Sequence, residues 1–250
     1  MFLPWFSRKA GAQRPAALPP GLRVYAIGDV HGRADLLREL DERIAADARG
    51  GSAREMRTVL LGDYVDRGPD SREVVERIVR GRLGGLPTTC LLGNHEAMLL
   101  RFLEDVAEAR RWLTYGGRAT LMSYGVPAAR GDATDAALGA LQREFRDRFP
   151  SEHRDFLARL PRHASFGDYF FVHAGIRPGV PIERQNDTDL IWIREEFLAS
   201  SDFHGRIVVH GHSYKHEPEV MPNRIGIDTG AYATGRLTCL VLERSDLRFL

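Results

Sequence analysis

Cysteine, net charge and long apolar runs are all scarce in this chain of 250 residues. The two cysteines, Cys90 and Cys239, each stand within an apolar stretch, which favours buried thiols over a disulfide or a thiolate zinc site. With 35 basic and 34 acidic residues the formal charge is +1, so net charge indicates no nucleic-acid partner. No segment reaches the roughly 18 apolar residues that span a bilayer. We therefore expect a cytoplasmic protein that binds neither nucleic acid nor membrane.

The first twenty residues also lack a pattern typical of folded structure. Pro4 and Ser7 interrupt the apolar start and no basic region precedes it, which excludes a signal peptide. The rest of this segment is rich in proline and alanine and predicts a disordered arm over residues 1–20. The chain as a whole has 43% hydrophobic residues and can bury one sizeable core, and we expect a single domain over residues 21–250.

Three strand-helix units follow the arm. LRVYAIG, MRTVLLG and LPTTCLLG are apolar runs typical of buried strands, and a stretch with apolar residues at helical spacing comes after each. Strands that alternate with helices predict a layered α/β core. The polar turns after the strands read GDVHG (28–32), GDYVDRGPDS (62–71) and GNHE (93–96). Their side chains are thus expected at the carboxyl ends of strands, where α/β sheets bind ligands.

The second half of the chain is organised differently. Residues from about 110 to 162 predict a helical insertion, which either packs on the core or forms a cap that shapes the substrate site. HASFGDYFFVHAG then predicts a hairpin around Gly167 and Asp168, whose second strand leads to His173. Three further apolar runs, around VVHGH (208–212), GIDTG (226–230) and LTCLVLE (237–243), predict more strands, so this half is mainly β.

Residues at five strand ends offer ligands for metal ions. They are Asp29, His31, Asp63, Asn94, His173 and one histidine of VVHGH. This mixture of oxygen and nitrogen donors suits manganese, iron or zinc rather than a thiolate site. Spacing leaves the last ligand open between His210 and His212, because residues two apart on a strand face the same side. Gly211 favours His212, since glycine lets the backbone come close to an ion.

GDVHG, GDYVDRG, GNHE, VHAG (172–175) and the late GH pair resemble the motifs of the calcineurin-like metallophosphoesterases. Within that family the chain is most similar to the phosphoprotein phosphatases, in the compact serine/threonine type of bacteria and phages. The resemblance covers residues from about 24 to 242. It implies an α/β fold with a central β-sandwich flanked by helices and two divalent metal ions at one edge, with Mn²⁺ expected before Fe or Zn.

The resemblance also implies which residues hold the ions. A first ion is expected on Asp29 and His31, a second on Asn94, His173 and His212, with Asp63 as the bridge between them. Family members carry their last ligand as the histidine of a late GH pair, which again favours His212 over His210.

Three residues near these ligands are expected to act in catalysis. His95 follows the ligand Asn94 and is free to protonate a leaving oxygen. Asp66 is the carboxylate expected to orient it, as in other pairs of histidine and aspartate. Arg67 offers a planar fork for two phosphoryl oxygens.

A second arginine usually completes the phosphate clamp in this family. Arg194 matches the spacing of the compact bacterial members, and Arg177 is the alternative because it stands nearer to the metal ligands in the sequence. Asp228 is predicted to fix a ligand histidine as a hydrogen-bond acceptor.

The main functional interpretation is a phosphomonoesterase that depends on two metal ions, a serine/threonine protein phosphatase of broad specificity. A metal-bridging hydroxide would attack phosphorus in line, on a phosphoprotein or small phosphoester substrate. The alternative is a bis(5'-nucleosyl)-tetraphosphatase-like hydrolase of dinucleoside polyphosphates. Members of that group commonly lack the acidic residue at the position of Asp66 and carry GNHD, whereas this chain has GNHE, so the motifs favour the first interpretation. A binding protein without activity is disfavoured, because every ligand and His95 are present.

Overall fold

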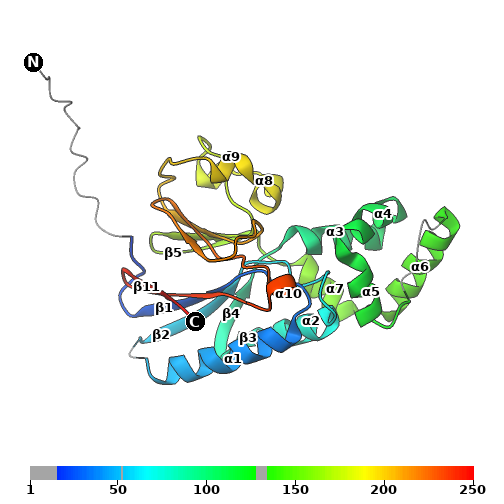
Figure 1. Ribbon diagram of the computed structural model, residues 1–250, viewed down its shortest axis with the longest axis horizontal. Helices are drawn as coiled ribbons and strands as arrows, with labels where there is room; N and C mark the ends of the chain where they lie inside the picture. Colours follow the sequence, from blue (N-terminus) through cyan, green and yellow to red (C-terminus); the bar gives the residue numbers. More distant parts are fainter. Residues whose placement is uncertain (1–15, 52, 128–133) are drawn as a thin grey trace, which may run out of the picture.

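The computed structural model describes residues 16–51, 53–127 and 134–250 and has two β-sheets in these ranges (Figure 1). The first sheet has six strands in the order β11-β10-β1-β2-β4-β3. They are β1 (Leu22–Ile27), β2 (Glu55–Leu60), β3 (Arg82–Leu83), β4 (Leu86–Cys90), β10 (Cys239–Glu243) and β11 (Asp246–Phe249). Strands β1, β2 and β4 run parallel, as the three strand-helix units predict, and β10 pairs antiparallel with β1.

The second sheet has five strands in the order β5-β6-β7-β9-β8. They are β5 (His163–Phe166), β6 (Tyr169–Val172), β7 (Ile207–His210), β8 (Glu219–Val220) and β9 (Arg224–Gly226). Strands β5 and β6 form the predicted hairpin. Strands β6, β7 and β9 are parallel, so the residues that follow β6 and β7 come to the same end of the sheet.

The two sheets pack face to face as the predicted β-sandwich. Val24 of β1 lies in the apolar core between the sheets, together with Phe171 and Val209 of the second sheet. The neighbouring side chain of Tyr25 belongs instead to the larger core on the helical side of the first sheet. Because successive side chains of a strand point to opposite faces, one strand supplies both cores.

Helices cover the outer faces of both sheets (Figure 1). The helices outside the insertion are α1 (Ala34–Arg49), α2 (Ser71–Val79), α3 (Asn94–Glu104), α8 (Asp187–Trp192), α9 (Glu195–Leu198) and α10 (Ala231–Thr234). Helix α1 buries Leu37, Leu40 and Ile44, which recur at helical spacing and face the first sheet. Every helix within the described ranges is too short or too polar to cross a lipid bilayer.

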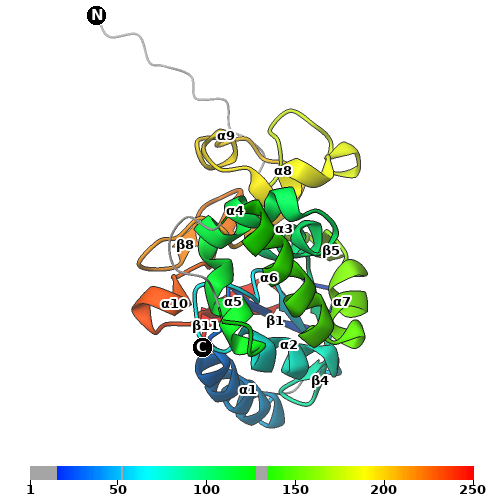
Figure 2. The same ribbon diagram turned by 90° about the vertical axis from the view of Figure 1, so that its right-hand side faces the viewer.

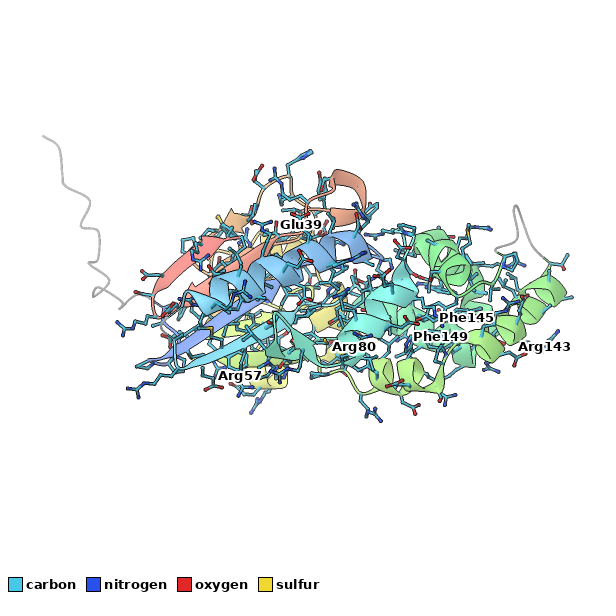
Figure 3. All side chains as sticks on the ribbon, turned by 90° about the horizontal axis from the view of Figure 1, so that it is seen from below. Glu39, Arg57, Arg80, Arg143, Phe145 and Phe149 are labelled. Atoms are coloured by element: carbon cyan, nitrogen blue, oxygen red, sulfur yellow. The ribbon has the colours of Figure 1, made fainter. Side chains whose placement is uncertain are left out.

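Between residues 109 and 158 the described chain forms a group of helices to one side of the sandwich (Figures 1 and 2). They are α4 (Ala109–Trp112), α5 (Arg118–Ser123), α6 (Asp135–Arg148) and α7 (Ser151–Ala158). Aromatic contacts hold them to the core: the Trp112 ring stacks on Phe102 at 4.6 Å and lies 5.8 Å from Phe145. Figure 3 shows Phe145 and Phe149 among these helices and Arg143 at their outer end. Helices thus occupy the range where we expect an insertion.

The N-terminal segment departs in part from the predicted arm. Residues 1–15 lie outside the described residues. Residues 16–20 contact the sandwich: the Leu18 amide donates to the carbonyl of Arg244 at 2.8 Å, and the Asp168 amide donates to that of Ala17 at 3.0 Å. Leu18 itself is buried in the core between the sheets. The sandwich therefore begins before the boundary expected at Pro20, because Leu18, within a segment rich in proline and alanine, packs in the core.

Candidate metal centre

The polar turns after five strands meet at one edge of the sandwich. They bring together the side chains predicted as ligands: Asp29, His31, Asp63, Asn94, His173 and His212. All six residues are buried, with exposed fractions between 0% and 6%. Because the strands of each sheet that carry them are parallel, their carboxyl ends lie side by side, and residues far apart in the sequence become neighbours.

Asp63 lies between two groups of imidazoles. Its Oδ2 atom is 3.5 Å from His31 Nε2, and its Oδ1 atom is 3.4 Å from His173 Nε2. Two sets of candidate ligand atoms result, one from His31, Asp63 and His95 and the other from Asp63, His173 and His212, with the atoms of each set within 4.8 Å of one another. A carboxylate that belongs to both sets is in the position of a bridge between two ions.

Asn94 and Asp29 extend the two sets. The side-chain oxygen of Asn94 lies 2.9 Å from His173 Nε2. The carboxylate of Asp29 accepts from the backbone amide of His212 at 3.1 Å. Gly211 permits this approach, because a Cβ atom at that position would lie 2.1 Å from Asp29 Oδ1. The close neighbour of Gly211 is thus the Asp29 carboxylate, whereas the sequence analysis expected an ion there.

The donor atoms fit divalent metal ions. Nε2 of His212 is buried and has no hydrogen-bond partner among the described residues, a costly state for an imidazole nitrogen unless an ion or water binds it. Burial and the nearby imidazole of His173 lower the pKa of His212 to about 2. The neutral form that a metal requires is therefore the stable one. Carboxylate, amide and imidazole donors without a thiolate suit Mn, Fe or Zn.

Backbone carbonyls orient two of the candidate ligands. Nδ1 of His31 lies 2.9 Å from the carbonyl of Val65, and Nδ1 of His173 lies 3.0 Å from the carbonyl of Leu61. A hydrogen bond from Nδ1 to a carbonyl fixes the tautomer and leaves the Nε2 lone pair for a metal ion.

Asp228 does not take the position that we predicted. Its carboxylate accepts from the Gly230 amide at 2.9 Å, and no hydrogen bond links it to a ligand histidine in the described part of the chain. Burial, together with the negative charge of Asp63, raises the pKa of Asp228 to about 6. For His31 and His173 the prediction failed because backbone carbonyls, which sequence patterns do not place in space, already occupy Nδ1.

His210 and His212 lie in different surroundings. The His212 ring is 4.9 Å from that of His173, whereas the His210 ring packs on Phe197 at 5.1 Å. Nδ1 of His210 lies 3.0 Å from the carbonyl of Gly211, and neither set of candidate ligand atoms in the described ranges includes His210. His212 has a φ of 61°, so the chain has left the strand geometry on which the expectation of a shared face depended.

Left-handed backbone conformations gather at this edge. Six non-glycine residues in the described ranges have positive φ, and five of them are His31 (44°), Asp63 (54°), Asp66 (72°), Arg67 (68°) and His212 (61°). Such conformations cost on the order of 1 kcal/mol or more each and persist only where the surroundings hold them. These turns therefore place their side chains at the edge of the sandwich at a cost in local backbone energy.

Glu96, the last residue of GNHE, holds the second turn in place. Its buried carboxylate accepts from the backbone amides of Asp63, Tyr64 and Val65 at 2.9, 2.7 and 3.2 Å, and from that of Gly93 at 3.1 Å. We assigned this residue no role from the sequence. A glutamate at the third position of a helix is nevertheless a sequence signal, because it forms a capping box with the residue before the helix.

His95 and Asp66 form the pair that we predicted from the sequence. Nδ1 of His95 lies 2.7 Å from Asp66 Oδ2, and both residues are buried. Burial lowers the pKa of His95, but the charges of Asp63 and Asp66 outweigh it and the pKa is raised. Nε2 of His95 lies 3.8 Å from Asp63 Oδ2, beside the candidate ligands. A protonated imidazole in this position can donate to a leaving oxygen.

Two side chains of the insertion hold the Asp66 carboxylate. Nε1 of Trp112 donates to both of its oxygens at 3.0 and 3.1 Å, and the Thr120 hydroxyl donates to Oδ1 at 2.6 Å. The sequence gave no signal for either contact, because 46 and 54 residues separate these positions from Asp66. The insertion thus fixes the carboxylate that orients His95.

Comparison with known proteins identifies the family. A family model described as calcineurin-like phosphoesterase matches residues 22–237. The chain belongs to the calcineurin-like phosphoesterase family. It is 28% identical over 235 residues to the asymmetrical bis(5'-nucleosyl)-tetraphosphatase PrpE of Halalkalibacterium halodurans, an alignment that covers 86% of this chain and 87% of the relative. It is 34% identical over 157 residues to the symmetrical bis(5'-nucleosyl)-tetraphosphatase of Dechloromonas aromatica, covering 63% of this chain and 45% of that relative.

A solved structure of a candidate diadenosine tetraphosphatase has the same fold. It aligns with a TM-score of 0.64 and 23% sequence identity over 94% of this chain and 97% of its own. The predicted family and the sandwich with flanking helices are confirmed. The narrower assignment to the phosphoprotein phosphatases is not confirmed, since the relatives above carry tetraphosphatase names.

Arg67 lies across the opening of this phosphoesterase's candidate centre. Its two terminal nitrogens are 2.7 Å from His31 Nε2 and 3.1 Å from His95 Nε2. Its guanidinium carbon is 5.0 Å from the centre of the Tyr232 ring. Arg67 is exposed, so its fork can exchange these contacts for those of an oxyanion.

The two arginines proposed for the second half of the clamp differ in their partners. Arg177 binds Asp189 through two contacts of 2.7 Å and also pairs with Glu196. Arg194 forms no ion pair with a residue that the structure describes. Burial and the imidazole of His173 do most to lower the pKa of His212, and the positive charge of Arg194 lowers it further. Arg194 is therefore the arginine that remains available near the candidate ligands.

Partly exposed aromatic side chains surround the opening. We call them the aromatic rim, which consists of Tyr115, Trp192 and Tyr232. Their ring centres lie 6.2, 6.1 and 5.5 Å from those of His95, His212 and His31, respectively. Tyr115 and Tyr232 are 41% and 44% exposed. The rim comes from three separate segments, so the sequence did not indicate it.

Proposed function

We propose that this phosphoesterase hydrolyses a phosphoanhydride bond of dinucleoside polyphosphates, the alternative of the sequence analysis. Metal-dependent hydrolysis is supported by one observation: the carboxylate of Asp63 belongs to both sets of candidate metal ligands. The substrate class is supported by the tetraphosphatase name of a relative that aligns over 86% of this chain.

In this proposal the predicted residues hold two divalent ions. Asp29 and His31 would hold one, Asn94, His173 and His212 would hold the other, and Asp63 would contribute to both. Bound ions of this kind supply a water of lowered pKa and neutralise charge on phosphoryl oxygens. The donors combine oxygen and nitrogen atoms, which suits Mn²⁺, Fe or Zn, and Mn²⁺ is proposed first.

Three further residues act on the substrate directly, and three others act through His95. Arg67 and Arg194 bind oxygens of the phosphoryl group that is transferred. His95 donates a proton to the leaving oxygen, and Asp66 keeps its imidazole oriented and protonated. Trp112 and Thr120 hold Asp66 and thereby act through His95.

A second candidate function is hydrolysis of phosphomonoesters, including phosphoserine and phosphothreonine in proteins. The hydrogen bond of 2.7 Å between His95 and Asp66 favours it. An alkoxide leaves poorly without a proton, whereas a phosphate leaving group needs less help from a general acid. Protonation by the His95–Asp66 pair should therefore accelerate the hydrolysis of an alkyl ester more than that of a phosphoanhydride.

Turnover of three substrates side by side separates the two functions. The protein is stripped with a chelator, dialysed, supplied with Mn²⁺, and assayed on diadenosine tetraphosphate, a phosphothreonine peptide and para-nitrophenyl phosphate. A kcat/KM for diadenosine tetraphosphate at least about tenfold above the other two is expected, with products separated by chromatography as ATP and AMP or as two ADP. A higher kcat/KM on the peptide would establish the second candidate instead. Full turnover without metal would contradict both.

A further inference from the structure

A cavity of about 520 Å³ opens beside the aromatic rim. It lies where α8 meets α3 and the insertion, helices that are neighbours in Figure 2. The lining residues that bear on its chemistry are Leu100, Arg101, Arg111, Arg162, Ile191 and Trp192. None of them has a part in the hydrolysis proposed above.

Trp192 connects the cavity with the candidate metal centre. Its side chain lines the cavity, and its ring lies 6.1 Å from His212 and 6.0 Å from Tyr115. Helix α3 makes a second connection, since it begins with Asn94 and His95 and lines the cavity with Ala97 and later residues. A ligand with its phosphate at the metal centre can therefore extend past Trp192 into this space.

The lining combines an aromatic face with unpaired positive charge. The Arg111 guanidinium carbon lies 5.3 Å from the centre of the Trp192 ring. Arg162 is paired with Asp187 at 3.1 Å, whereas Arg101 and Arg111 form no ion pair with any described residue. Leu100 and Ile191 supply apolar surface. An aromatic face binds a nucleobase by stacking, and free guanidinium groups bind phosphate.

We propose that this cavity binds one nucleotide end of the substrate. The base stacks on Trp192, and Arg101 and Arg111 contact the phosphates that are not transferred. The inference rests on the proposed function, since of the two candidate substrate classes a dinucleoside polyphosphate is the one that places a base and additional phosphates beyond the phosphorus that is attacked. An acidic peptide is the competing occupant, and it would use the arginines without the ring.

The first experiment compares two substrates in matched variants. For Trp192→Leu and for Arg111→Gln, kcat/KM on diadenosine tetraphosphate divided by kcat/KM on para-nitrophenyl phosphate is expected to fall about tenfold, the usual size of one lost base or phosphate contact. Trp192→Phe retains a ring and is expected to keep most of the ratio. Wild-type ratios in both Trp192→Leu and Arg111→Gln, in a protein that cleaves diadenosine tetraphosphate, would overturn the proposal.

Two control variants match these changes in residue type. Phe203→Ala removes an aromatic side chain that is 52% exposed, before the start of β7 and thus at the opposite end of that strand from His212. Arg143→Gln removes an exposed arginine at the outer end of the insertion, labelled in Figure 3. Both are expected to keep the wild-type ratio. Thermal melting shows for each variant that the fold is retained.

A second experiment does not depend on the proposed function. ATP and inorganic triphosphate are compared as inhibitors of para-nitrophenyl phosphate hydrolysis. ATP is expected to have an inhibition constant about tenfold below that of triphosphate, and Trp192→Leu is expected to remove this difference. Equal inhibition in the wild type would overturn the nucleotide cavity whatever the protein does with diadenosine tetraphosphate. Failure to cleave that substrate, with ATP still preferred, would instead count against the proposed function alone.

Discussion

The floor and the rim of the candidate centre are built in opposite ways. We use "floor" for the six predicted ligands together with His95 and Asp66. The floor is buried and fixed by backbone amides, backbone carbonyls and left-handed turns, whereas the rim residues Tyr115 and Tyr232 are more than 40% exposed and contact the floor through their rings. A fixed floor determines which bond chemistry is available. An exposed rim determines which substrate molecules can bind over the floor.

This difference leads to a general expectation for mutations. Changes in the floor should reduce activity on every substrate, because each substrate presents the same phosphoryl group to the same ligands. Changes in the rim and the adjoining cavity should alter the ratio between substrates, because substrates differ in the groups that extend beyond that phosphoryl group.

The largest effect is expected for Asp63→Asn. The amide removes the charge that both sets of candidate ligands share, so at least one ion should be lost and kcat should fall by about 10³-fold or more on all substrates. Elemental analysis of the purified variant and turnover with saturating Mn²⁺ test this. Asp246→Asn, at an exposed carboxylate of β11, is the control and should retain full metal content. Wild-type stoichiometry together with wild-type kcat in Asp63→Asn would exclude Asp63 as a ligand that both ions share.

The two histidines of VVHGH provide the next test. His212→Ala removes a candidate ligand and is expected to lose one metal equivalent and about 10²-fold or more in kcat. His210→Ala removes a ring that packs on Phe197 and should retain both ions, with at most a few-fold loss. Metal stoichiometry of the two variants is the measurement. Loss of metal in His210→Ala alone would reverse the assignment.

His95→Asn is expected to separate substrates by their leaving groups. A general acid typically contributes about 10²- to 10⁴-fold, and most of it where the leaving oxygen is a poor one. The loss in kcat should therefore be greater for an alkyl phosphate than for para-nitrophenyl phosphate, whose phenolate leaves without a proton. Losses of equal size on both esters would give His95 a different role.

The smallest loss of activity is expected for changes to the two insertion residues that hold Asp66. Trp112→Phe and Thr120→Val each remove a hydrogen bond to Asp66, which should cost about tenfold in kcat on the alkyl phosphate and less on para-nitrophenyl phosphate. Thr120→Ser keeps the hydroxyl and should restore the rate. Phe145→Leu loosens the same aromatic cluster without touching Asp66, so it should lower the melting temperature but leave the ratio of the two esters unchanged. If Phe145→Leu changed the ratio of kcat on the two esters as much as Trp112→Phe does, Trp112 would have a packing role only.

Local patterns in the sequence were sufficient for much of the fold. The three parallel strands with their helices, the hairpin of β5 and β6 and the sandwich follow from apolar periodicity, turn residues and the family resemblance. The short strands β3 and β8 were not predicted, because two residues carry no periodicity. Composition likewise did not separate Leu18 from the segment before it, although it lies in the core.

The sequence by itself determined which residues are candidates for metal binding and catalysis, because the candidate ligands and the His95–Asp66 pair stand in short motifs at strand ends, and parallel strands bring those ends together. Only the tertiary structure decided how these residues are held and what surrounds them. The carbonyls behind His31 and His173, the contacts from Trp112 and Thr120 to Asp66, and the cavity beyond Trp192 join segments that are far apart in the chain. Such contacts depend on the packing of one element against another, and no local spacing encodes them.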